Sequence, residues 1–151
     1  MNIILVRLGG ETAVSTWSVL MYVDGFVQPL LYGMCDSLQP SVGYNWGARR
    51  FDRVWAIERW CFGTAFAVSV VCGAAIIAAP GPIASLFIAG GDAEALSMAV
   101  EALRIFGLTY LTRWLSYAAQ ACLLALEMAL PASILSLSTA LVVPLVLIAV
   151  F

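Results

Sequence analysis

The stretch WCFGTAFAVSVVCGAAIIAA, residues 60–79, decides the fold class of this chain. A helix needs roughly 20 mostly apolar residues to cross the hydrocarbon core of a bilayer. This stretch has that length, and the whole segment 60–91 contains no charged residue. It therefore predicts a transmembrane helix.

The composition of the whole chain agrees with that prediction. Hydrophobic residues make up 63% of its 151 residues and charged residues only 11%. A soluble domain is about half apolar and about a quarter charged. We therefore expect an all-α, polytopic bundle of transmembrane helices in contact with membrane lipids. The net charge is −2 and lysine is absent, and nothing in the sequence resembles a nucleic-acid-binding surface, so we expect no nucleic-acid partner.

Further apolar segments flank the first one along the chain. We expect four main spans, at 13–42, 54–79, 95–126 and 131–151. The residues 1–8 are interpreted as the end of a preceding helix, and the polar, Gly-containing segment 43–53 as a loop.

Proline and acidic residues indicate where these helices begin and end. Pro80 and Pro82 end the second span, since proline donates no backbone N–H. Asp52 and Asp92 are candidate N-caps for the second and third spans. Pro131 suits the first turn of the fourth span.

The positions of arginine predict the orientation in the membrane. Four of the seven cations lie in or near the 43–53 loop: Arg49, Arg50, Arg53 and Arg59. Because cytoplasmic loops carry an excess of basic residues, this loop is predicted to be cytoplasmic. We interpret Glu11, Glu58, Arg59, Glu101, Arg104 and Glu127 as solvated or headgroup-facing residues at span ends.

Polar side chains form a stripe along each of two spans. On the first span they are Asp24, Gln28, Tyr32, Asp36 and Gln39, with Pro29 expected to kink the helix or free a carbonyl. On the third they are Thr109, Arg113, Ser116, Tyr117 and Gln120. Charged residues inside a membrane are costly and are candidates for function. Three interpretations stay open: a cavity or ion path, helix packing through polar contacts, or a structural ion pair between Asp24 and Arg113.

Enzyme chemistry has no support in the sequence. The chain has no histidine, no Gly-x-Ser-x-Gly motif and no paired metal ligands. Its four cysteines form no Cys-x-x-Cys pair, and we interpret them as small, buried apolar residues. We expect no enzyme activity, no cofactor and no resident metal.

The segment LQPSVGYNWGARRFDRV, residues 38–54, resembles a motif of the multidrug and toxic compound extrusion (MATE) family. It is most similar to the branch with the MepA-type and DinF-type exporters. The motif residues here are Gln39, Pro40, Gly43, Tyr44, Asn45, Gly47, Ala48 and Arg49. Shorter segments around Gly10, Phe87, Arg104 and Pro131 also resemble the family in their order.

The resemblance implies a fold of twelve helices in two six-helix lobes. It favours the C-terminal lobe, so this chain would hold the end of helix seven, helices eight to ten and most of helix eleven. The remaining helices and the second lobe would be its partners. The implied function is export of organic, often cationic, compounds in exchange for H⁺ or Na⁺, by a multi-pass protein of the cell membrane, here the inner membrane of a bacterium.

The resemblance has one departure that affects the coupling ion. Some branches bind their cation in the C-terminal lobe through acidic residues on helices seven and ten. Here the middle of the expected helix ten carries Arg113 and no acid. The candidates for a cavity or cation-coupling role therefore come from the polar stripes alone: Asp24, Gln28, Asp36, Gln39, Arg113, Tyr117 and Gln120.

Two other functions stay open. A lobe of a lipid-linked sugar flippase has a related fold, and an Arg-rich cavity would favour it. A non-transporting membrane scaffold or gene fragment belongs to a different class, and the unfinished appearance of both chain ends motivates it.

Overall fold

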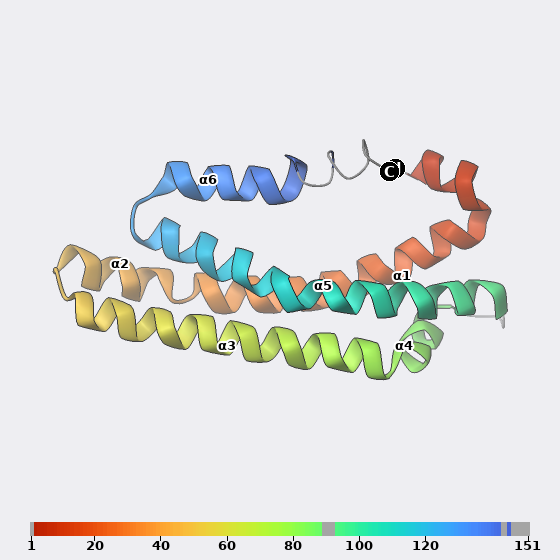
Figure 1. Cartoon of the computed structure of the whole chain (residues 1–151), viewed down its shortest axis with the longest axis horizontal. Helices are drawn as coiled ribbons and strands as arrows, with labels where there is room; N and C mark the ends of the chain where they lie inside the picture. The colour runs from red at the N-terminus through yellow and green to blue at the C-terminus, as the bar shows by residue number, and fades with distance from the viewer. Residues whose placement is uncertain (1, 89–92, 143–144, 146–151) are drawn as a thin grey trace. The chain divides into compact units, whose positions relative to one another are not determined.

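The computed structural model describes residues 2–88, 93–142 and 145, with only the backbone for residues 2–9. The described residues fold into helices joined by short connections (Figure 1). The helices are α1 (Asn2–Asp36), α2 (Gln39–Gly47), α3 (Phe51–Ala78), α4 (Pro80–Phe87), α5 (Ala93–Ala125), α6 (Ala129–Leu137) and the π-helical turn η1 (Ser138–Val142). The all-α prediction is confirmed for these residues.

Glycine and proline set several of the helix boundaries. Gly10 has φ 65° and ψ −157°, so α1 consists of two helical pieces on either side of it. Only glycine adopts such a positive φ readily. Pro29 lies inside α1 with helical dihedral angles, so the kink or freed carbonyl expected there stays a prediction. Pro80 begins α4 and Pro131 lies in the first turn of α6, as expected for a residue without a backbone N–H.

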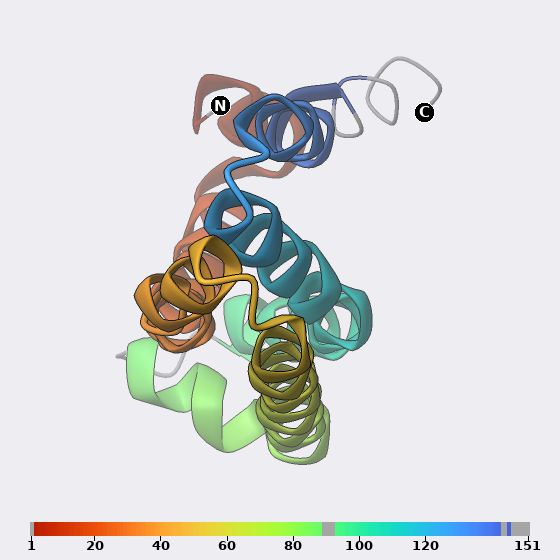
Figure 2. The same cartoon turned by 90° about the vertical axis from the view of Figure 1, so that its left-hand side faces the viewer.

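The predicted loop at 43–53 is wrong for most of its length. Helix α2 continues through Gly47 and α3 begins at Phe51, which leaves only residues 48–50 as a turn (Figure 2). Asp52 therefore lies inside the first turn of α3 rather than before it. The predicted first span, 13–42, is also interrupted, because α1 ends at Asp36 and α2 starts at Gln39. Asp92, the other predicted N-cap, lies outside the described residues.

The chain divides into two compact units, and α1, α3 and α5 each contribute to both. The first unit comprises residues 1–30 and 69–111. Its buried apolar residues come from all four of its helices, α1, α3, α4 and α5: Val19, Val23, Val27, Ile76, Ala84, Ala95, Ala99 and Leu103. Small residues bring α3 and α5 together there. A methyl group on Gly73 would lie 3.0 Å from the carbonyl oxygen of Gly107.

The second unit comprises residues 31–68 and 112–151. It holds two buried apolar clusters. The larger cluster contains Cys35 from α1, Cys61 and Ala65 from α3, and Ala118 and Ala121 from α5. The smaller cluster contains Val42 from α2, Val54 from α3 and Ala125 from α5. The segment predicted as a loop lies between Val42 and Val54 of this cluster, and its own Asn45 is buried.

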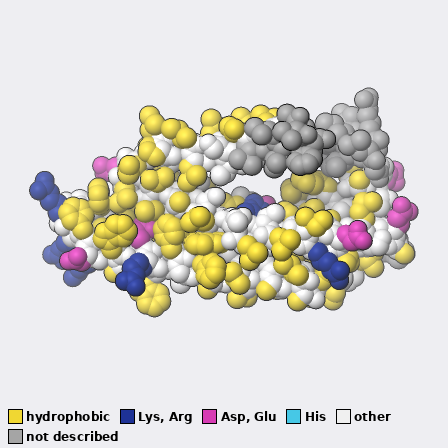
Figure 3. All heavy atoms as spheres, viewed as in Figure 1, with side chains coloured by type: hydrophobic (Ala, Val, Ile, Leu, Met, Phe, Trp, Pro, Cys, Tyr) yellow, Lys and Arg dark blue, Asp and Glu magenta, His cyan; other side chains and the backbone are white. Residues whose placement is uncertain are grey.

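The outer surface carries many large apolar side chains. Trp60 is 75% exposed, and Phe26 and Leu86 are about as exposed. Figure 3 shows such side chains spread over the visible face, with basic side chains gathered where α2 meets α3. Within the described part of the chain, α3 and α5 are long and apolar enough to cross a membrane. An apolar exterior of this kind fits lipid rather than water.

Candidate functional site

The first polar contact joins α1 to α5 in the first unit. Tyr110 is fully buried, and its hydroxyl donates a hydrogen bond to Oδ1 of Asp24 at 2.9 Å. The hydroxyl of Ser69 on α3 donates in turn to the backbone carbonyl of Tyr110. Phe106 packs edge-on against the Tyr110 ring. Three contacts therefore hold Tyr110, and through it the half-buried Asp24 carboxyl, in a defined position.

The second polar contact lies in the second unit and forms a network of Tyr32, Arg113, Tyr117 and Gln120. The Tyr32 hydroxyl donates to Oε1 of Gln120 at 3.2 Å, which links α1 to α5. The rings of Tyr32 and Tyr117 lie 5.0 Å apart. Arg113 donates to the Tyr117 hydroxyl at 3.1 Å, and its guanidinium carbon lies 5.9 Å from the centre of that ring. We call this group the tyrosine network.

Asp36 and Gln39 form a local contact at the break between α1 and α2. The amide nitrogen Nε2 of Gln39 donates to Oδ1 of Asp36 at 2.7 Å. Asp36 is exposed, and Gln39 is half-buried. These two residues therefore lie at a helix end and not within either unit's core.

The remaining stripe residues occupy intermediate or exposed positions. Gln28 and Ser116 are half-buried, whereas Thr109 is exposed and donates to the carbonyl of Phe106. Asp24 belongs to the first unit and Arg113 to the second, so their pairing stays a prediction.

The MATE-like motif residues build α2 and the turn after it. Pro40 lies in the first turn of α2, and Gly43 faces α5, with the Ala125 carbonyl oxygen 3.5 Å from where a methyl group would be, an ordinary contact distance. Asn45 is buried, and its Nδ2 donates to the carbonyl of Ser41.

The other motif residues end α2. Ala48 follows the last helical residue, Gly47, and Arg49 has a positive φ of 57°. The backbone N–H of Arg49 donates to the Trp46 carbonyl at 2.9 Å, which closes the turn. Tyr44 points outward and is 76% exposed. In this structure the motif residues form α2 and the turn that ends it, and Gly43 packs against α5.

Two residues of the site were not found from the sequence. Tyr110 lies seven positions before Tyr117 and three before Arg113, so the helical spacing of the α5 stripe would have included it. Glu58 was expected to face solvent or headgroups, and that expectation is wrong, because it is only 7% exposed. The packing of α1 and α5 over α3 causes this burial, and the spacing of four and three residues from Val54 to Glu58 to Cys61 could have indicated it.

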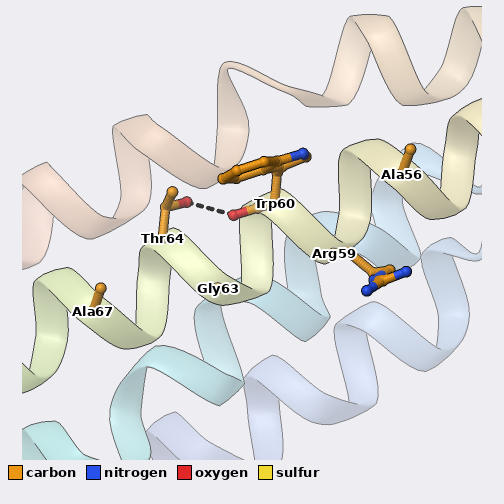
Figure 4. A pocket seen from close by; sticks show the side chains of 6 residues that line it. All are labelled: Ala56, Arg59, Trp60, Gly63, Thr64 and Ala67. Carbon is orange, nitrogen blue, oxygen red and sulfur yellow. Dashed lines mark hydrogen bonds between the residues drawn. The ribbon is translucent and has the colours of Figure 1, made fainter.

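Two hollows, one in each unit, are mainly apolar. One of about 420 Å³ in the first unit is lined by residues that include Tyr22, Phe26 and Phe87, with the Tyr22 and Phe87 rings stacked 5.4 Å apart. Another, in the second unit, is formed by one face of α3 alone (Figure 4). Small residues such as Gly63 make that hollow, beside the exposed Trp60 and Arg59. Neither hollow contains a carboxyl group, so the polar contacts above remain the candidate site.

Comparison with protein families gives one finding. The family model MatE matches residues 1–150 of the chain. Comparisons with curated proteins and with solved structures find no match.

Proposed function

The chain belongs to the MatE family, whose members are membrane transporters, and from this premise we propose that it is part of a secondary active exporter. Its substrates are organic, often cationic, drugs or toxins, and it exchanges them for H⁺ or Na⁺. It works in the cell membrane, the inner membrane of a bacterium, surrounded by lipid and together with a second lobe.

The motif at residues 39–49 supports a finer assignment within the family. Its order of Gln-Pro, Gly-Tyr-Asn and Gly-Ala-Arg resembles that of the MepA/DinF-like branch, and this resemblance favours a C-terminal lobe. We propose that assignment for this chain.

The hydrogen bond between Tyr110 and Asp24 is the observation that carries the proposal of ion coupling. A carboxyl group in a membrane-spanning helix is costly, so such groups mark ion or substrate paths. Asp24 is half-buried on α1, and a hydroxyl from α5 is aimed at it. A bound cation would neutralise the carboxylate and weaken the hydrogen bond from this hydroxyl, because hydrogen bonds to an ionised acceptor are the stronger ones. Binding of H⁺ or Na⁺ would therefore change how α1 contacts α5, which is the kind of change that exchange requires.

The test uses cells that naturally carry the gene. Deleting the coding sequence should raise the accumulation of the fluorescent organic cation ethidium, and returning the intact sequence should restore export. The variant Asp24→Asn should reach the membrane in normal amounts but fail to restore export. Glu101→Asn, at an exposed position on α5, serves as the matched control and should restore it.

Vesicles from the same membranes identify the coupling ion. Ethidium movement driven by an imposed pH gradient, and not by a Na⁺ gradient, assigns H⁺, and the reverse assigns Na⁺. Unchanged ethidium accumulation after deletion, together with full activity of Asp24→Asn, would contradict the proposed function.

A further inference from the structure

Glu58 occupies an unusual position between the two apolar clusters of the second unit. It lies one helical turn after Val54, a member of the smaller cluster, and three residues before Cys61, a member of the larger one. These three residues share one face of α3. That face is covered by α5, so Glu58 is only 7% exposed even though its neighbour in sequence, Arg59, is exposed.

Among the described residues, the titratable groups around the Glu58 carboxyl are thiols. The Cys122 thiol on α5 lies within hydrogen-bonding reach of the carboxyl. Cys61 on α3 and Cys35 on α1 are the other titratable groups near it. The carboxyl oxygen Oε2 is buried and has no hydrogen-bond partner among the described residues. All three thiols are free cysteines, and a thiol is uncharged near neutral pH.

These surroundings oppose an ionised carboxylate. Burying an isolated negative charge without a positive partner is far more costly than burying a neutral group, and a carboxyl in such a place takes up a proton instead. A protonated carboxyl needs fewer hydrogen-bond donors around it than a carboxylate, and the thiol of Cys122 can still donate to its carbonyl oxygen.

A metal cation, Na⁺ included, fits the residues around Glu58 less well than a proton does. Hard cations prefer several oxygen ligands, whereas the polar neighbours of Glu58 are sulfur atoms. Among the residues that the structure describes, no three His, Cys, Asp or Glu side chains are arranged to hold a metal ion.

We propose that Glu58 is a buried proton-binding site. Its carboxyl carries a proton in the packing described here, and it releases that proton to water, leaving a carboxylate, only when α3 and α5 separate at this level. The assignment of the proton to coupled export rests on the proposed function, whereas the presence of the proton does not.

Infrared spectroscopy of the purified protein tests the proposal directly. A protonated carboxyl gives a C=O stretching band that an ionised carboxylate lacks. We expect this band at neutral pH in the original protein, its loss in Glu58→Gln, and its retention in Glu101→Gln. Glu101 is the matched control because it is an exposed carboxyl on α5. Absence of the band in the original protein, or its persistence in Glu58→Gln, would overturn the proposal.

A second variant keeps Glu58 in place and so does not depend on the folding of Glu58→Gln. In Cys122→Ala the carboxyl loses its thiol neighbour, so the band should remain but shift in frequency. An unshifted band would mean that the protonated group lies elsewhere in the protein. A protein that shows the expected bands but exports no ethidium would contradict the proposed exporter function and leave the proton site standing.

Discussion

The close approach of α3 to α5 in the first unit makes a sharp prediction about Gly107. A methyl group added there would lie 2.7 Å from Cγ1 of Ile77 and 3.3 Å from the carbonyl oxygen of Gly73. Carbon atoms in favourable contact are about 3.5–4.0 Å apart. The variant Gly107→Ala must therefore push Ile77, or the whole of α3, away by about 1 Å.

The size of the effect follows from two opposing terms. Overpacking a tight contact costs about 1–3 kcal/mol. Replacing glycine by alanine inside a helix stabilises the helix by up to about 1 kcal/mol. Because Cγ1 is close to the backbone of Ile77, rotation of the side chain end alone does not relieve the contact. We expect a net loss of about 1–2 kcal/mol in the free energy of unfolding of the first unit, as the difference of these terms.

Alkylation of the native cysteines measures this loss. The protein is titrated with SDS in mixed micelles, and mass spectrometry follows the modification of each cysteine. Cys72 reports on the first unit, and the buried Cys61 reports on the second. In Gly107→Ala, Cys72 should react at a lower SDS fraction than in the original protein.

The matched control is Gly25→Ala on α1 in the same unit, where a methyl group meets nothing within 4 Å. This change should leave the reaction of Cys72 unaltered or delay it slightly, because alanine favours the helix. If Gly107→Ala proves as stable as Gly25→Ala, α3 and α5 do not approach each other as described.

Three further predictions concern the polar residues and the topology. Tyr110→Phe removes the hydroxyl that donates to Asp24 and should cost about 1–3 kcal/mol in an SDS titration; an unchanged midpoint would contradict the contact. If Asp24 and Arg113 pair, Asp24→Asn and Arg113→Gln should each destabilise the protein more than the double variant does; strict additivity would exclude pairing. In sealed cells, an impermeant thiol reagent should label a cysteine placed at position 92 and not one at 50; the opposite pattern would invert the orientation.

The fold class was predictable because membrane insertion depends on a simple property of the sequence. The charge-free segment 60–79 needs no knowledge of its neighbours to predict a span. Pro80 likewise ends α3 for a local reason. The match of the chain to the MatE family agrees with the resemblance seen at residues 39–49.

Helix α2 was missed because its residues are typical of loops in water. Gly43, Asn45 and Gly47 all disfavour helix on local grounds. In the structure, Gly43 lies against α5 at ordinary contact distance, and the side-chain amide of Asn45 donates to the carbonyl of Ser41 in the preceding turn. Tertiary packing therefore outweighs the local preference, and only the Val42–Val54–Ala125 cluster reveals it.

The site residues could be predicted only where periodicity applies. Asp24 and the tyrosine network follow helical spacing, so the sequence placed them on two stripes. Which residue of one stripe contacts which residue of the other depends on how far α1 is shifted along its axis relative to α5. The spacing of residues along a single helix does not give that shift. Tyr110 with Asp24 and Tyr32 with Gln120 are therefore findings of the structure.

Three carboxyls are candidates for the coupling role, and their surroundings separate them. Asp36 is exposed and bonded to its own neighbour Gln39, so proton or cation binding there would change little beyond a helix end. Asp24 accepts from Tyr110 on another helix, and both its carboxylate and this hydroxyl offer oxygen atoms, the ligand type that suits H⁺ or Na⁺ alike. Glu58 has sulfur neighbours and a buried oxygen without a partner, which suits a proton alone. An exporter driven by Na⁺ would therefore depend on Asp24 and tolerate Glu58→Gln, whereas one driven by H⁺ would be impaired by the loss of either carboxyl.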